Sequence, residues 1–268
     1  MKIVSTLLFI ATVAAVSSCS KSNDAIDVIN SGNANISKLA YPDSVFYVTN
    51  QQDYIVRPVS QTAGSYFSFP EGLSLDANSG AINVTKSDAG LKYRVSFVAN
   101  GKTDTTSTFI VISGINYLDG FYNLSKGDSI LKPLYNANPQ KAIPGINNGT
   151  TFDVGMNCNS QGCIVNQANA EINLAETVRS GVFGKVPANN DRKEFEMTYR
   201  INDNSAKVDN KLRVKLYFFN SMADVTPEAF DIITSREGTI IGTGNTTVAP
   251  LAVKRARPRP PCIFIVGR

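Results

Sequence analysis

The stretch YRVSFVANGKTDTTSTFIVI, residues 93–112, decides the fold predicted for this chain. Apolar and polar residues alternate over Tyr93–Ala99, and β-branched residues fill most of Thr106–Ile112. Alternation with a period of two turns one face of a strand toward a core and the other toward solvent. Asn100-Gly101, between the two runs, is a dipeptide typical of a tight hairpin turn. We therefore expect these residues to form the last hairpin of a β-sandwich.

The preceding segment, FPEGLSLDANSGAINV at residues 69–84, has the pattern of two short strands joined by a turn. Its apolar residues alternate toward a core. The side chains of Asp76 and Asn78 suit a turn because they can accept hydrogen bonds from backbone N–H groups two residues on, and Gly80 can adopt positive φ.

This segment, together with AGLKYRV at residues 89–95, resembles the immunoglobulin-like repeats of bacterial surface proteins, which are related to cadherin-like domains. The resemblance covers roughly residues 39–113 and implies an Ig-like β-sandwich, a fold that hosts many functions. Cadherin-like domains often bind Ca²⁺, so the resemblance makes Asp76 and Asn78 candidate metal ligands. The acidic linker of that family is missing, so a plain turn is the favoured interpretation and calcium binding the alternative.

From Gly114 onward the β pattern continues in a second unit. Lys193–Ile201 and Lys211–Phe219 alternate clearly, with charged residues on the outer face. Thr151–Met156 is expected to be a shorter strand, and Cys262–Val266 the last strand, covering a sheet edge.

Two helices interrupt this second unit. Asn173 and Glu176 have the spacing of a capping box at the start of a helix that runs to Gly181. Thr226–Gly238 has Thr before the helix, Pro at the first helical position and Gly past the end. The expected fold is therefore mainly β: an Ig-like β-sandwich over residues 39–113, then a second β-rich, sandwich-like domain over residues 114–268 with one or two short helices.

The N-terminus has the features of an export signal. Lys2 is followed by an apolar run from Ile3 to Val16, too short to span a bilayer. Val16-Ser17-Ser18-Cys19 resembles the bacterial lipobox, which implies a signal peptide over residues 1–18 and an acylated Cys19 that holds the protein to the lipid bilayer. An ordinary cleaved signal with an incidental Cys is the alternative. Residues 19–38 are polar and predict a flexible stalk.

The residues around Cys19 also indicate, by resemblance to lipoproteins, where in the cell envelope the protein lies. Ser20, instead of Asp, follows Cys19, which by Gram-negative sorting rules favours an outer-membrane lipoprotein. Three Asp-Ser/Thr triplets, beginning at Asp43, Asp104 and Asp128, resemble the O-glycosylation sequon of Bacteroidota envelope proteins. The resemblance implies a Bacteroidota-type lipoprotein; whether it faces the periplasm or the cell surface stays open.

Three cysteines remain after Cys19, in a compartment that permits disulfides. Cys158 and Cys163 bracket a Gly-containing turn, so a local bridge between them is the simplest pairing. A bridge to Cys262, or plain buried thiols, are the alternatives. Structural zinc is not favoured, because the chain has no His.

The amino-acid composition excludes several classes of function. Without His, Ser-His-Asp and Cys-His catalysis are excluded, and no spacing singles out a pair of catalytic carboxylates. We therefore expect no enzyme, no catalytic residue and no cofactor beyond the lipid on Cys19. The net charge of +4 is modest and lies largely in the tail from Lys254 to Arg268, so no nucleic-acid partner is expected.

The expected function is a membrane-anchored, non-catalytic binding or adhesion protein, with a polysaccharide or a protein as partner and glycan as the ligand considered first. Trp is absent, and five aromatic residues are candidates for stacking on a sugar, although such residues more often belong to a core: Tyr41, Tyr47, Tyr54, Tyr66 and Phe67. The alternative is a structural or assembly component of the envelope, such as a pilus-like subunit whose strand Cys262–Val266 pairs with a neighbour, or a partner of an outer-membrane complex.

Overall fold

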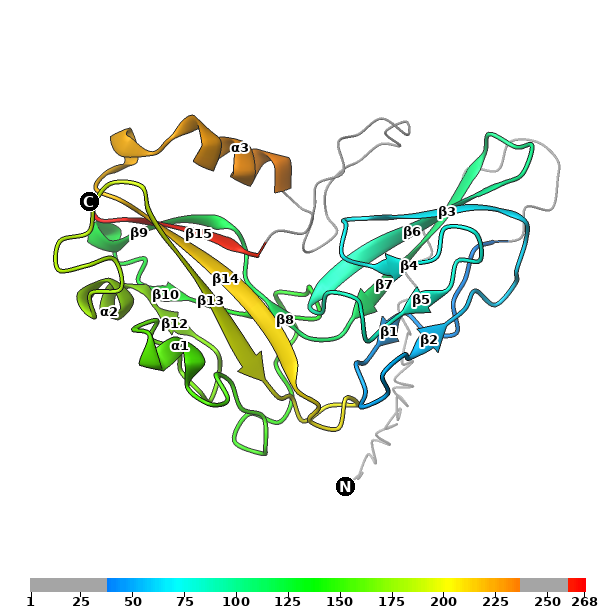
Figure 1. Cartoon of the computed structure of the whole chain (residues 1–268), viewed down its shortest axis with the longest axis horizontal. Coiled ribbons are helices and arrows are strands. Elements are labelled where there is room, and N and C mark those ends of the chain that lie inside the picture. Colours follow the sequence, from blue (N-terminus) through cyan, green and yellow to red (C-terminus); the bar gives the residue numbers. More distant parts are fainter. Residues whose placement is uncertain (1–37, 237–259) are drawn as a thin grey trace, which may run out of the picture. The chain divides into compact units, whose positions relative to one another are not determined.

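A computed structural model of the chain describes residues 38–236 and 260–268 (Figure 1). The predicted signal peptide over residues 1–18, Cys19 and the stalk up to residue 37 lie outside the described residues, as does the basic stretch from Lys254 to Arg259. The described residues belong to one compact unit. The predicted domain boundary at residues 113 and 114 stays a prediction.

The N-terminal region is a β-sandwich of two sheets around one core (Figure 1). Both sheets contribute buried side chains to that core, including Val56 and Ile82 from one sheet and Tyr93 and Ile110 from the other. The first sheet has the order β1 (Val45–Phe46), β7 (Thr105–Ile112), β6 (Leu91–Ala99) and β3 (Gly64–Phe69), and the second has β2 (Ile55–Val56), β5 (Ile82–Asn83) and β4 (Ser74–Leu75).

The predicted hairpin forms as β6 and β7, which pair antiparallel with Val98 opposite Thr105. The connection is longer than a two-residue turn. Gly101 adopts φ 73°, and Lys102 N donates to Ala99 O at 3.0 Å. The turn expected at Asn100-Gly101 is therefore present, closed by this bond, but the connection between the two strands continues to Asp104.

Gly80 is required by its surroundings. It adopts φ 69°, and a Cβ atom there would lie 2.6 Å from the ring of Tyr66. Its carbonyl oxygen accepts a hydrogen bond of 2.7 Å from Tyr41 OH. The glycine of the family-like pattern thus lets the turn after β4 approach the aromatic core closely.

The second region is built on a four-stranded sheet of order β13 (Asp191–Tyr199), β14 (Asn210–Phe219), β15 (Cys262–Val266) and β9 (Gly120–Asn123). β13 and β14 form the predicted alternating hairpin. β15 pairs in parallel with β14 on one side and with β9 on the other. The last strand therefore lies inside its sheet, whereas the sequence led us to expect it at an edge.

Both faces of this sheet are covered. Ile263 and Ile265 of β15 enter the core beneath the sheet, and Phe264 enters a second cluster under α3 (Pro227–Arg236). Phe264 is fully buried, with its ring centroid 4.6 Å from that of Tyr217. Because both faces are buried, β15 is apolar throughout instead of alternating.

The remaining elements are short. The mainly β fold is confirmed, and both predicted helices are present as α2 (Leu174–Arg179) and α3. The expected strand Thr151–Met156 is wrong: Thr151 makes an isolated bridge to Arg200, and the chain then turns into α1 (Asn157–Ser160), a helix that the sequence did not predict. The other short elements are β8 (Ile115–Asn116), η1 (Leu124–Lys126), β10 (Ile130–Leu131), β11 (Leu134–Tyr135), β12 (Ile172–Asn173) and η2 (Met222–Asp224).

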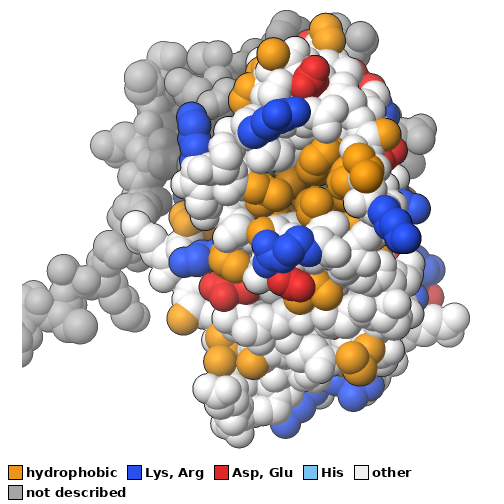
Figure 2. Space-filling view, turned by 90° about the vertical axis from the view of Figure 1, so that its left-hand side faces the viewer, with side chains coloured by type: hydrophobic (Ala, Val, Ile, Leu, Met, Phe, Trp, Pro, Cys, Tyr) orange, Lys and Arg blue, Asp and Glu red, His pale blue; other side chains and the backbone are white. Residues whose placement is uncertain are grey.

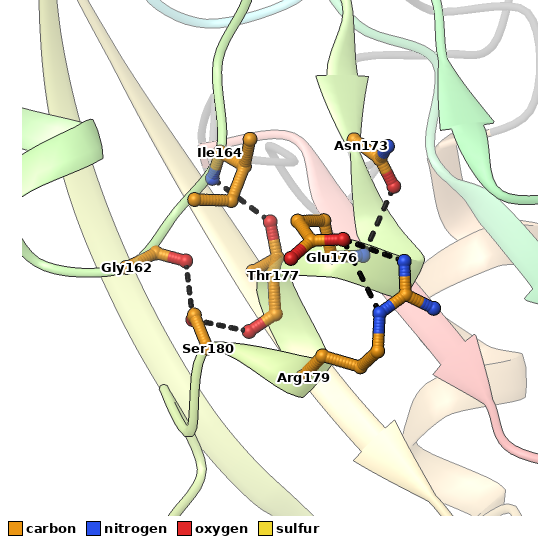
Figure 3. A network of polar contacts seen from close by, with 7 residues as sticks. All are labelled: Gly162, Ile164, Asn173, Glu176, Thr177, Arg179 and Ser180. Atoms are coloured by element: carbon orange, nitrogen blue, oxygen red, sulfur yellow. Dashed lines mark hydrogen bonds and ion pairs between the residues drawn. The ribbon is translucent and has the colours of Figure 1, made fainter.

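Side-chain caps hold α2 in place (Figure 3). Asn173 Oδ1 accepts from Glu176 N at 3.0 Å, which confirms the predicted N-cap. Thr177 Oγ1 accepts from Ile164 N at 2.9 Å, and Ser180 Oγ donates to Gly162 O at 2.7 Å (Figure 3). These two bonds attach the helix to the loop on both sides of Cys163.

Hydrogen bonds also join the sandwich to the second region. Ser113 Oγ and Tyr135 OH donate to Asp203 Oδ2, at 3.1 and 2.7 Å. Tyr199 OH accepts from Ile115 N at 3.2 Å. The segment after β7 is therefore held by buried and partly buried hydrogen bonds, and removing one partner would leave the other polar group unsatisfied.

We predict that Phe264→Ala destabilises the protein by about 3–5 kcal/mol, because it removes a fully buried ring from a cluster that cannot close the cavity. Urea unfolding measures the change. The matched control is Val186→Ala, since Val186 is 85% exposed and should change stability by less than about 0.5 kcal/mol. Equal effects of the two substitutions would contradict this account of β15.

Candidate functional site

A pocket of about 200 Å³ opens where the sandwich meets the second sheet. It is smaller than the usual ligand pocket of a few hundred Å³ or more, so it suits one small group rather than a long ligand. Its described lining residues are Asp88, Ala89, Leu91, Asn116, Glu196, Lys211, Leu212, Arg213, Pro260 and Pro261.

The β13–β14 hairpin supplies one charged wall of this pocket. Lys211 Nζ lies 2.7 Å from Glu196 Oε1, and Arg213 Nη1 lies 3.4 Å from Glu194 Oε1. These side chains share the outward face because the strands alternate, and their inward neighbours fill the core. Both ion pairs are partly exposed, so they fix the positions of the charges more than they stabilise the fold.

Asp88 supplies an unpaired acceptor. Its backbone is held on both sides, since Asp88 N donates to Gly72 O at 2.8 Å and Asp88 O accepts from Tyr93 OH at 2.8 Å. No described residue donates a hydrogen bond to its carboxylate. Asp88 is exposed, but desolvation by the atoms around its carboxylate raises its pKa, and the positive charge of Arg213 opposes the rise.

Asn116 on β8 supplies a buried amide to the same pocket. The residue is only 5% exposed, and its Oδ1 accepts from Tyr117 N at 2.9 Å. No described residue accepts a hydrogen bond from Asn116 Nδ2. The pocket therefore combines an unpaired carboxylate with an unpaired amide donor, both carried by backbone that is hydrogen-bonded in place. Neither residue was singled out from the sequence, where an Asp after a turn and an Asn in a strand look ordinary.

Asp76 and Asn78, the candidate calcium ligands, lie in the turn between β4 and β5, and neither lines the pocket. Asp76 Oδ1 accepts from Asn78 N at 3.1 Å and from Ser79 N and Oγ, both at 2.7 Å. The bonds from Ser79 and Asn78 lower the pKa of Asp76. This carboxylate closes its own turn, as the plain-turn interpretation expects. In the part of the chain that the structure describes, no three His, Cys, Asp or Glu residues are grouped so that they could hold a metal ion.

Cys158 and Cys163 are brought together as buried free thiols. The neighbouring thiol of Cys163, together with burial, raises the pKa of Cys158. Cys163 N also donates to Cys158 O at 3.0 Å. Cys262 lies in β15 and packs in the cluster under α3. The geometry thus favours the local pair over the alternative with Cys262, and the bridge itself stays a prediction.

Asp153 is a buried residue beside this thiol pair that the sequence analysis placed in a strand. Its carboxylate accepts from Cys158 N at 2.8 Å, and from Asn159 N and Nδ2 at 2.9 and 2.7 Å. It is fully buried and adopts φ 48°. Three hydrogen bonds compensate the burial of its carboxylate, so Asp153 orders the start of α1.

The candidate stacking aromatics are mostly structural. Tyr41 and Tyr66 are buried in the sandwich core, and Tyr66 packs against Phe97 with ring centroids 4.6 Å apart. Tyr47, Tyr54 and Phe67 are half-buried. None of the five lines the pocket, so a sugar there would meet Leu and Pro side chains instead of aromatic rings.

A separate hydrophobic hollow, ringed by Lys and Arg, lies on the side of the molecule where α2 and the C-terminus are found (Figure 2). Nothing in the structure shows what covers it. In the described ranges, 38–236 and 260–268, no helix combines the length and the apolar character that crossing a membrane requires.

Comparison with known proteins does not show which family the chain belongs to. No protein-family model matches it, and no curated protein does. Among solved structures, the crystal structure of Drosophila N-cadherin EC1-4 is similar at a TM-score of 0.21 and 11% identity, over 67% of this chain and 49% of that chain. The match thus spans about half the length of the cadherin chain. A TM-score of this size carries no argument, so the mainly β assignment rests on the strands themselves.

We predict that Cys158 and Cys163 form a disulfide under oxidising conditions, because the two buried thiols are neighbours on one hydrogen-bonded loop. Alkylation under denaturing, non-reducing conditions should then label Cys262 but leave Cys158 and Cys163 unmodified. After reduction, all three should be labelled, as mapped by peptide mass spectrometry. Full labelling of the pair before reduction would show that it stays as thiols.

We predict that Asp88 makes stability depend on pH. A carboxyl group with a raised folded-state pKa favours folding below its unfolded-state pKa of 3.8, and this contribution is lost as the pH rises through the folded-state value. Urea unfolding of the wild type and Asp88→Asn between about pH 3 and pH 7 measures this. The wild type should lose stability relative to the variant as the pH rises. A difference that is constant over this range would contradict the shift.

Proposed function

We propose that this protein is an exported, lipid-anchored binding protein of the cell envelope, non-catalytic, which takes up a small polar ligand such as one unit of a glycan. The observation that carries the proposal is the pocket beside β14, whose lining includes Asp88, with an unpaired carboxylate, and Asn116, with an unpaired amide donor. Perturbed and unpaired polar groups in a cavity are typical of binding sites.

The pocket is better suited to holding a ligand than to transforming one. Its described lining contains no Ser, Thr or Cys to act as a nucleophile. Glu196 and Lys211, which could act as acid or base, hold each other at 2.7 Å. Two groups remain available: the Asp88 carboxylate, which accepts hydrogen bonds, and the Asn116 amide, which donates them. Neither has a partner that would activate it for catalysis.

The position of β15 bears on the alternative of an assembly subunit. Both backbone edges of this strand are already paired, with β14 and with β9. Pairing with a neighbouring subunit would require the strand to leave its own sheet and expose five fully buried residues. We therefore favour ligand binding over subunit assembly as the function.

The membrane anchor is tested with Cys19→Ala. We expect the wild type to fractionate with membranes and to incorporate radiolabelled palmitate, whereas the variant should lose both properties because the acyl chains provide the membrane affinity. Protease treatment of intact cells then decides which face of the membrane carries the protein. Membrane association that survives Cys19→Ala without lipid incorporation would refute the lipoprotein assignment.

A further inference from the structure

We infer that the pocket beside β14 selects an uncharged ligand with two neighbouring hydroxyl groups, as on a single neutral sugar ring. This inference rests on the proposed binding function and adds the class of ligand. It follows from three properties of the lining: which hydrogen-bonding groups are unused, how the charges are paired, and where the apolar side chains lie.

The unused groups consist of one acceptor and two donors. The carboxylate of Asp88 can only accept, and no described residue donates to it. Asn116 Nδ2 can only donate. Arg213 has one described hydrogen bond, from Nη1 to Glu194 at 3.4 Å, which leaves guanidinium N–H groups available.

A hydroxyl group matches such a mixed set because it donates and accepts at the same time. One hydroxyl of a neighbouring pair can donate to Asp88, while its oxygen or that of the second hydroxyl accepts from Asn116 or Arg213. A ligand with acceptors alone would leave the Asp88 carboxylate without a donor. Asp88 is exposed in the free protein, and a bound ligand that covered its carboxylate without donating to it would lose affinity, so this ligand would be rejected.

The charges of the lining oppose a charged ligand of either sign. The lining contains two carboxylates, Asp88 and Glu196, and two cations, Lys211 and Arg213. An anionic ligand would have to displace Glu196 and Glu194 from these cations and would approach Asp88. A cationic ligand would approach Lys211 and Arg213. A neutral ligand avoids both the repulsion and the desolvation of an additional charge.

The rest of the lining suits the C–H face of a ring. Leu91, Leu212, Ala89 and the Pro260-Pro261 pair are apolar, and the volume of about 200 Å³ leaves room for a small ligand. Pro side chains are rigid, so this wall is formed before the ligand binds, which reduces the entropic cost of binding.

The test is calorimetric titration of the mature full-length chain with five probes. Glucose, galactose and mannose are neutral, galacturonate is anionic and glucosamine is cationic at neutral pH. We expect at least one neutral sugar to bind more tightly than both charged probes. Asp88→Asn should weaken that binding by about tenfold to a hundredfold, because it removes hydrogen bonds to a charged acceptor.

The matched control is Asp104→Asn, which makes the same chemical change in the exposed loop between β6 and β7, outside the pocket, and should leave affinity unchanged. Thermal unfolding of both variants checks that they fold. Tighter binding of galacturonate or glucosamine than of any neutral sugar, or neutral-sugar binding that Asp88→Asn does not weaken, would overturn the inference.

A wider screen separates this failure from failure of the proposed function. If none of the five probes binds, the inference is overturned. The same chain is then tested with hydrolysates of envelope polysaccharide and with a peptide library. Binding there would preserve the binding function with another class of ligand, and the absence of any binding would overturn the proposed function as well.

Discussion

The structure of the second region depends on the insertion of β15 between β14 and β9. The strand is paired along both edges, and its alternate side chains enter two different cores. Without it, β9 would lose its connection to the β13–β14 hairpin, because the two are linked only through β15 in the sheet order. One short apolar segment at the end of the chain thus completes the sheet and both of its buried faces.

The same insertion brings the pocket together. Cys262 N donates to Asp119 Oδ1 at 2.6 Å, a contact between residues 143 positions apart, and Lys215 N donates to Pro261 O at 2.9 Å. These bonds hold the two prolines before β15 against the beginning of β14, where Lys211 and Arg213 point outward. The opposite side of the pocket belongs to the sandwich: it is lined by Leu91, the first residue of β6, and by Asp88 just before that strand. The candidate site therefore exists because distant segments pair, and no single segment carries it.

Several elements could be predicted from local patterns. The alternation in β6, β13 and β14 predicted the right strands, because a period of two is set by backbone geometry and survives in any sheet that buries one face. For β7 the β-branched residues were the signal. The capping of α2 by Asn173 was also predictable, since the side chain and the N–H that it accepts are three residues apart. The strand expected over Thr151–Met156 failed for a related reason: Asp153 and its hydrogen bonds to Cys158 and Asn159 favour a turn that hydrophobicity does not reveal.

Local patterns were sufficient to predict that the chain is mainly β, where its longest strands and two helices lie, which turn needs Gly80 and which two cysteines are neighbours. Each of these features depends on residues close together in the chain. The tertiary structure was needed to show that the last strand lies inside a sheet and that Asp88, Asn116 and Arg213 line one pocket. Sheet order and side-chain neighbours across the fold are set by pairing between segments far apart in the chain. Such pairing leaves no local pattern in the sequence.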